Sequence, residues 1–174
     1  MNTTIKDLKE RRSIHKYKPE QITEEELNTV LEVGTYAPNG RGLQSPLIVA
    51  VQDKAIIAKL SVINANILGQ SGFEPFYGAP TVIIVLADKN RPTYIEDGSL
   101  VLGNLMNAAH AIGLGSCWIH RAKEEFESDA GKALLREWGI GDNYIGIGHC
   151  TLGYIAGDLP KAKLRKDGYV IKIK

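Results

Sequence analysis

The sequence carries almost no net charge, contains little cysteine and has no long apolar run. Its formal net charge is only +1, which excludes the generally basic surface of a nucleic-acid-binding protein. The longest apolar run, residues 80–87, is far too short to span a membrane. No basic and apolar leader precedes the first charge at Lys6, and we therefore expect a cytoplasmic protein.

Cysteine and histidine do not form the patterns of a metal site. The two cysteines, Cys117 and Cys150, lie in apolar stretches and are expected to be reduced and buried. The four histidines show neither HxxxH spacing nor an accompanying CxxC pair, so no metal is expected. His149 precedes Cys150, but the surrounding glycines indicate tight backbone packing and favour a structural role.

Several common catalytic signatures are also missing. Gly113-Leu-Gly115 and Gly146-Ile-Gly148 lack the third glycine of a dinucleotide fingerprint, and neither begins a strand-to-helix turn. The sequence contains no GxxxxGK[ST] phosphate loop and no GxSxG nucleophile elbow. A hydrolase therefore has little support.

The apolar pattern predicts helices interleaved with strands in one domain covering residues 1–174. Helices are expected over residues 3–11, from a capping box at residues 23–26 to just before Pro38, after Asp53, over 97–112 and around 126–138. Strands are expected over residues 47–51, 81–86, 116–119, 144–154 and 169–173, the first two of them buried. This order predicts layers of helices around a mixed sheet.

Two cationic clusters stand near opposite ends of the chain. Residues 11–16 read Arg-Arg-Ser-Ile-His-Lys, and residues 161–166 read Lys-Ala-Lys-Leu-Arg-Lys. Guanidinium groups match phosphate oxygens in shape, and a serine hydroxyl adds a neutral donor. With the glycine-rich loop at residues 39–42, the clusters suggest one small anion held between them. Composition alone favours the alternative, a solvated run of charges at a helix end.

An ordered series of segments accompanies the two clusters. The segments are Glu10–Tyr17, Tyr36–Pro46, Tyr77–Pro80, Asp97–Ser99, Gly113–His120 and Gly148–Tyr154. In this order and spacing they resemble the nitroreductase family of FMN-dependent oxidoreductases over nearly the whole chain. The resemblance implies an α+β fold, a three-layer α/β/α sandwich whose central sheet is mixed and mainly antiparallel. It also implies FMN as cofactor, bound between the subunits of a homodimer.

The resemblance implies a set of FMN-binding residues. Arg12, Ser13 and His15 are expected toward the phosphate and ribityl chain, with Arg11 nearer the ring edge. Gln44 matches a glutamine that hydrogen-bonds the pyrimidine side of the flavin. The full set is Arg11, Arg12, Ser13, His15, Gln44, Asn66, His120, Arg121, Lys163 and Arg165, with Asn64 as the alternative to Asn66.

Other parts of the set come from the middle and the end of the chain. Lys163 and Arg165 are expected to return to the phosphate. The backbone of residues 120–121 corresponds to the segment that faces flavin N5 and O4. Trp118 is expected in the core near the flavin, and Tyr77 at the rim of the pocket.

The implied activity is ping-pong hydride transfer from NAD(P)H through FMN to a small acceptor such as a nitroaromatic or a quinone. No side chain is expected to act as a general acid, because the flavin carries the chemistry. The helix over residues 97–112 and the strand over residues 169–173 are the expected dimer elements. A flavin-binding or sensory module without turnover is the alternative, and an anion-binding interaction protein is a third.

Overall fold

A four-stranded sheet forms the centre of the molecule, in the order β1-β2-β4-β3. The computed structural model describes residues 2–174. The strands are β1 (Leu47–Val51), β2 (Thr81–Asp88), β3 (Gly115–Ile119) and β4 (Tyr144–Gly153). Every pair of neighbouring strands is antiparallel, and Ser13 adds an isolated parallel bridge to Ser116 on the β3 edge.

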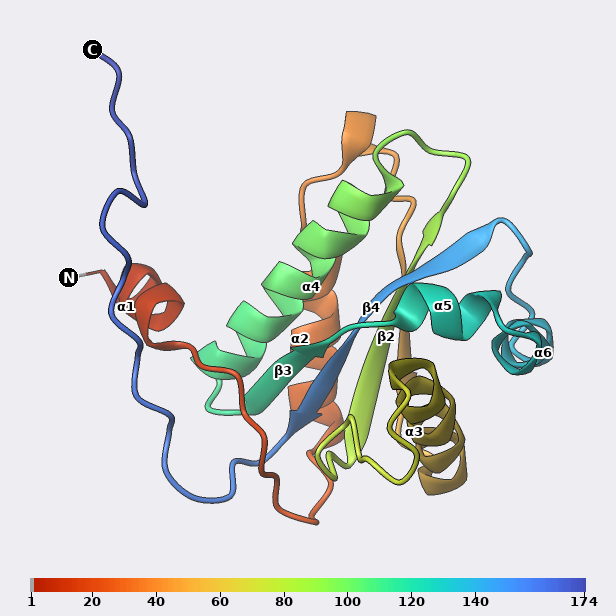
Figure 1. Ribbon diagram of the computed structural model, residues 1–174. Coiled ribbons are helices and arrows are strands. Elements are labelled where there is room, and N and C mark those ends of the chain that lie inside the picture. The colour runs from red at the N-terminus through yellow and green to blue at the C-terminus, as the bar shows by residue number, and fades with distance from the viewer. Residues whose placement is uncertain (1) are drawn as a thin grey trace.

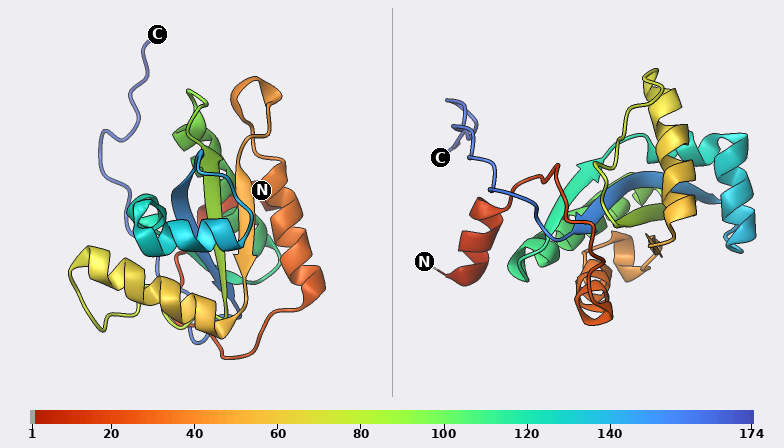
Figure 2. Two further views of the ribbon diagram at one scale, coloured as in Figure 1. Left: turned by 90° about the vertical axis from the view of Figure 1, so that its right-hand side faces the viewer. Right: turned by 90° about the horizontal axis from the view of Figure 1, so that it is seen from below.

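Helices cover both faces of this sheet (Figures 1 and 2). The helices are α1 (Thr3–Glu10), α2 (Glu24–Thr35), α3 (Lys54–Leu68), α4 (Tyr94–Ala111), α5 (Ala122–Glu127) and α6 (Asp129–Glu137), with a 3-10 turn at Gly40–Gly42. Helices α2 and α4 lie on one face, and α3, α5 and α6 lie on the other. Within residues 2–174, none of the helices has the length and apolar content needed to cross a bilayer.

Strand β2 explains why the fold has three layers. Its residues are almost all buried, and they alternate between two apolar clusters as strand geometry requires. Ile83 and Val85 pack against the α2 and α4 side, whereas Val82 and Ile84 pack against the α3, α5 and α6 side. The expected α/β/α sandwich is therefore confirmed.

Two helix starts follow directly from local sequence. Thr23 Oγ1 accepts a hydrogen bond from Glu26 N at 3.2 Å, and Glu26 Oε2 accepts one from Thr23 N at 2.8 Å. Asp53 Oδ1 accepts from Ala55 N and Ile56 N at 2.8 and 2.9 Å. These hydrogen bonds confirm both the capping box and the Asp53 cap. Each cap satisfies amides that lack a partner within the helix.

Glycines bring β4 very close to its neighbours. A Cβ atom built at Gly146 would overlap the Ala122 carbonyl, and one at Gly148 would lie 2.5 Å from Trp118 Nε1. These close approaches confirm the expected tight packing around His149 and Cys150. At Gly146, strand β4 lies directly against the start of α5.

Four expectations about individual elements are wrong. Strand β1 is an edge strand and is buried only at Val51. The helix expected around residues 126–138 is divided at Ser128, whose extended backbone and hydroxyl cap α6. Residues 169–173 form no strand and lie in an exposed tail. Trp118 is 45% exposed and is not in the core of the single chain.

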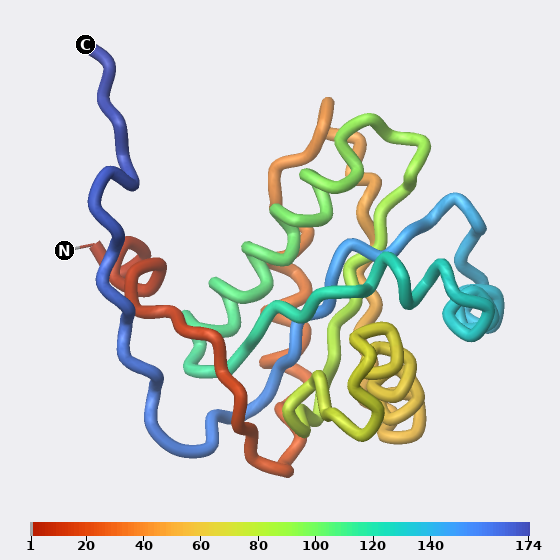
Figure 3. The backbone as a smooth tube through the Cα atoms, in the orientation of Figure 1, coloured from red at the N-terminus to blue at the C-terminus, as the bar shows by residue number. Residues whose placement is uncertain are grey.

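The N-terminal and C-terminal segments run side by side near the open ends of β3 and β4. Ile14 N donates to the Ser116 carbonyl at 3.0 Å, and Ala156 N donates to the Lys16 carbonyl at 3.1 Å. Figure 3 shows both terminal segments, red and blue, on the same side of the molecule. Beyond residue 156 the chain continues as the tail that Figure 1 shows rising beside α1.

Candidate functional site

The segment after α1 presents two guanidinium groups with free donors. Arg12 Nη1 donates to the carbonyls of Lys9 and Arg11, both at 2.8 Å, at the negative end of the helix dipole. Arg11 Nη1 and Arg12 Nε are shielded from solvent and have no hydrogen-bond partner among residues 2–174. A buried donor without a partner costs free energy. These nitrogens are therefore suited to an anionic or carbonyl ligand.

The neighbouring thiols do not neutralise Arg11. Both cysteines are free and buried, as expected. Burial raises the pKa of the Cys150 thiol to about 12. Burial also raises the pKa of Cys117, although Ser13 and Arg11 oppose that shift. Both thiols are consequently protonated at neutral pH, and the charge of Arg11 is not paired with a thiolate.

His15 forms a ring stack beside this segment. Its ring lies 4.3 Å from that of Tyr77, with an angle of 29° between the planes. The ring of Phe73 packs edge-on against that of Tyr77, with 6.4 Å between the two ring centroids. Ser13 and His15 are both exposed, and they follow the buried donors of Arg11 and Arg12 along the same extended segment.

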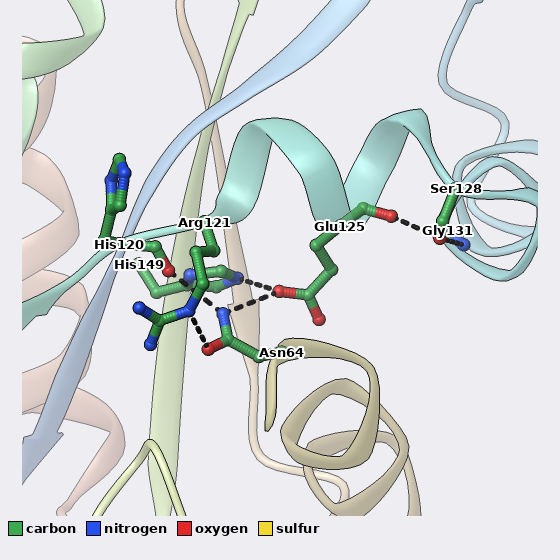
Figure 4. A network of polar contacts seen from close by, with 7 residues as sticks. All are labelled: Asn64, His120, Arg121, Glu125, Ser128, Gly131 and His149. Atoms are coloured by element: carbon green, nitrogen blue, oxygen red, sulfur yellow. Dashed lines mark hydrogen bonds and ion pairs between the residues drawn. The ribbon is translucent and has the colours of Figure 1, made fainter. Parts of the chain in front are cut away.

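A second polar group surrounds the peptide between His120 and Arg121 (Figure 4). Asn64 Nδ2 donates to the His120 carbonyl at 3.0 Å and to Glu125 Oε2 at 3.2 Å. Asn64 Oδ1 accepts from Arg121 Nε at 3.0 Å. Asn66 is exposed and lies two residues further along α3, on a different side of that helix. The structure therefore brings Asn64, and not Asn66, to residues 120–121.

Gln44 lies in a different part of the chain's surface from the Arg11–His15 segment. It borders a cavity of about 430 Å³ between α2, the loop before β1, and α4, together with Leu31, Ile48 and Val101. The Gly40–Gly42 turn nearby is held by Asp97, whose Oδ1 accepts from Gly40 N at 2.8 Å. This turn lies at the start of α4 in Figure 1, whereas α1 lies near the end of α4. Arg11 follows α1 directly and Gln44 follows the turn, so within one chain the two residues belong to segments at opposite ends of α4.

Lys163 and Arg165 lie in the exposed tail. Arg165 Nη2 donates to the Lys163 carbonyl at 2.8 Å. Across residues 2–174, no hydrogen bond or ion pair joins these two side chains to the segment Arg11–His15. The two cationic clusters thus lie on the same side of the molecule, with no hydrogen bond or ion pair joining them within residues 2–174.

Among residues 2–174, four residues other than glycine have a left-handed backbone, and three of them belong to these groups. They are Arg41 (φ 57°), Gln44 (φ 50°), Tyr77 (φ 56°) and Arg121 (φ 76°). Such conformations cost free energy and gather at functional sites. Gln44 and Arg121 are members of the expected FMN-binding set, and Tyr77 stacks on a third member. The sequence carries no signal for these conformations, nor for the buried position of Glu125.

Comparison with known protein families decides the family. The model of the nitroreductase family matches residues 8–154. The chain belongs to the nitroreductase family. The resemblance drawn from the sequence segments is thus confirmed, and it holds over most of the chain.

Individual members of the nitroreductase family agree with this assignment. A protein of Bacteroides fragilis, solved as a nitroreductase with bound FMN, is 27% identical, covers 100% of both chains and has a TM-score of 0.91. An FMN-dependent nitroreductase of Clostridium difficile is 27% identical over 99% of this chain and 98% of its own, with a TM-score of 0.84. A Bacillus subtilis protein named FMN reductase [NAD(P)H] is 27% identical over 98% of this chain and 66% of its own length.

Proposed function

We propose that this nitroreductase-family protein is an FMN-dependent oxidoreductase with NAD(P)H as hydride donor. Its acceptor is a small molecule such as a nitroaromatic or a quinone, and the donor leaves before the acceptor enters the same place. We propose further that residues 1–174 act as one FMN-binding domain in a cytoplasmic homodimer. FMN, when bound, supplies a ring that takes up a hydride and passes it on.

The unpartnered nitrogens of Arg11 and Arg12 are the observation that carries this proposal. An FMN phosphate has close to two negative charges near neutral pH and therefore requires several cations. Arg11 Nη1 and Arg12 Nε offer buried donors, and Ser13 and His15 follow them on the surface. The residues present thus fit the cofactor, with Lys163 and Arg165 of the tail as the second group of cations.

The position of Gln44 supports a site shared between two copies of the chain. Within one chain Gln44 and Arg11 belong to segments at opposite ends of α4. A second copy related by two-fold symmetry would supply its own Gln44 to the first copy's cationic segment. Each dimer would then contain two equivalent sites, and Gln44 would bind the pyrimidine side of the ring.

The first experiment is the visible spectrum of the purified protein, followed by anaerobic addition of NADH or NADPH. A yellow protein that bleaches supports the proposed enzyme. A yellow protein whose absorbance does not change supports the alternative, a flavin-binding module without turnover. A protein that stays colourless after incubation with FMN contradicts both.

Arg165→Ala tests whether the tail reaches the phosphate. Arg165 is exposed, and within residues 2–174 its side chain donates a hydrogen bond only to the Lys163 carbonyl, so we expect its removal to leave the folding of the single chain unchanged. A charge-assisted hydrogen bond is worth about 1.5–3 kcal/mol, so the Kd for FMN should rise by about 10- to 100-fold.

Lys172→Ala, in the same tail but outside the cluster, is the matched control and should leave the Kd unchanged. Unchanged FMN affinity in the double variant Arg12→Ala/Arg165→Ala would exclude a phosphate held by both ends of the chain.

A further inference from the structure

A carboxyl group and an imidazole lie in contact inside the apolar core beneath α5. Glu125 on α5 and His149 on β4 have fully buried side chains, and His149 Nε2 lies 2.9 Å from Glu125 Oε2. The rings of Phe76 and Phe126 flank the imidazole at centroid distances of 5.2 and 6.4 Å. A polar pair is therefore enclosed by aromatic rings.

The stability of the fold does not account for this pair. Glu125 Oε1 and both ring nitrogens of His149 have no hydrogen-bond partner within residues 2–174, although His149 Nε2 lies 2.9 Å from Glu125 Oε2. Buried polar atoms without partners are unfavourable, and apolar side chains of similar size often replace a buried pair without loss of stability. We therefore looked for a role of the pair in the side chains that it contacts.

Glu125, the member of the pair that contacts Asn64, holds its amide in one orientation together with the His120 carbonyl (Figure 4). Asn64 Nδ2 faces two acceptors, Glu125 Oε2 at 3.2 Å and the His120 carbonyl at 3.0 Å. A flipped amide would place its oxygen against the His120 carbonyl oxygen, which cannot donate to it. Asn64 Oδ1 is consequently directed to Arg121 Nε.

The same contacts fix the plane of the His120–Arg121 peptide. In a trans peptide the C=O and the following N–H point in opposite directions. Because the His120 carbonyl points to Asn64, the Arg121 N–H points away from the core, and it donates to no acceptor within residues 2–174. The left-handed backbone of Arg121 is held in the same way, by the bond from its Nε to Asn64.

We propose that Glu125 and His149 are positioning residues that act on the cofactor through Asn64. They orient the His120–Arg121 peptide so that its free N–H faces the flavin ring. This inference rests on the proposed function, in which that peptide lies against the ring. A donor held in a fixed direction stabilises charge that develops during hydride transfer, because it needs no reorganisation.

The double variant Glu125→Leu/His149→Leu tests this role. It replaces the pair by apolar side chains, so we expect a folded protein whose Tm is equal to or above that of the wild type. FMN should still bind, because the residues of the Arg11–His15 segment are unchanged. The rate of flavin reduction by NAD(P)H should fall about tenfold or more, and the absorption maximum of bound FMN should shift. A folded double variant with the wild-type spectrum and rate overturns the proposal.

Three single variants complete the test. Asn64→Ala removes the link but leaves the pair in place, so it should cause the same spectral shift even if the double variant does not fold. Glu125→Gln keeps an oxygen that can accept from Asn64, and it should restore the wild-type spectrum. A spectrum for Glu125→Gln like that of the double variant would contradict the hydrogen-bond route. Leu134→Val, in the same buried cluster, should lower Tm without moving the spectrum.

The wild-type protein separates this inference from the proposed function. Wild-type protein that binds no FMN overturns both. Wild-type protein that binds FMN but is not reduced by NAD(P)H overturns the enzyme, while the spectra of the variants still decide the positioning role.

Discussion

Arg121 links backbone conformation to the candidate site. Its φ of 76° is a left-handed conformation that glycine adopts without cost and other residues do not. The residue is also the N-cap of α5 and donates from Nε to Asn64. The side-chain bond and the strained backbone therefore act on the same peptide, and their contributions can be separated by substitution.

At Arg121 we expect glycine to be more stable than alanine. Both Arg121→Gly and Arg121→Ala lose the bond to Asn64, but only alanine keeps the unfavourable backbone, so glycine should be more stable by about 1 kcal/mol. Urea unfolding measures the difference. Lys123, within α5, is the matched control. The free energy of unfolding of Lys123→Ala should exceed that of Lys123→Gly by about 1 kcal/mol. The same order of stability at both positions would contradict a strained backbone at Arg121.

Helix α2 is the element whose start depends most clearly on side chains. Its capping box joins Thr23 and Glu26, and Glu26 Oε2 also accepts from the Tyr154 hydroxyl at 2.7 Å. The hydrogen bond from the Thr23 backbone, together with that from Tyr154, lowers the pKa of Glu26 below its ordinary value. The element is thereby tied to the end of β4, next to the segment that carries the cationic residues.

Thr23→Ala should destabilise the protein by about 1 kcal/mol, because the Glu26 amide loses its capping acceptor. Urea unfolding at neutral pH measures the loss, and Thr23→Ser should recover most of it. A loss for Thr23→Ser as large as that for alanine would show that the hydroxyl does not cap the helix.

The same cap predicts a pH dependence. A carboxyl group whose pKa is lower in the folded state adds stability above its unfolded value of 4.5 and loses it as pH falls through the lower folded value. The stability difference between wild type and Glu26→Gln should therefore be full at neutral pH and shrink below pH 4.5. A difference that does not change with pH would contradict the lowered pKa.

At the scale of the whole molecule, the C-terminal tail, residues 159–174, exposes its apolar side chains in the single chain. Its large apolar side chains alternate with cations, and Leu164, Ile171 and Ile173 are 98, 81 and 91% exposed. Exposed apolar side chains in such a row are typical of a segment that is buried against a partner. Strand β1, at the edge of the sheet, has unpaired backbone groups that another strand could use.

We therefore expect the wild-type protein to sediment as a dimer and a variant lacking residues 159–174 to shift toward the monomer. The truncated variant should also lose FMN, because it lacks Lys163 and Arg165. Sedimentation velocity combined with the flavin absorbance measures both effects. A monomeric wild type that retains FMN would exclude a site shared between two copies.

Local signals predicted most of the elements. The Thr23 and Asp53 caps act within three residues of themselves, so the sequence alone located both helix starts. The exposure of β1 was not predictable in this way, because its apolar residues suit an edge strand and a central strand equally well. The break at Ser128 was missed because the spacing of apolar residues continues through it, and only the packing of α6 shows the division.

The sequence by itself determined the family, the order of the elements and the cationic segment, because each depends on residues close together in the chain or on their order. Tertiary structure decided which asparagine serves residues 120–121, and it placed Gln44 far from Arg11. It also revealed the Glu125–His149 pair, for which the sequence has no pattern. The bonds of Asn64 join residues 56 and 61 positions apart. Such contacts are set by strand order and by the packing of α3 against α5, which no local pattern encodes.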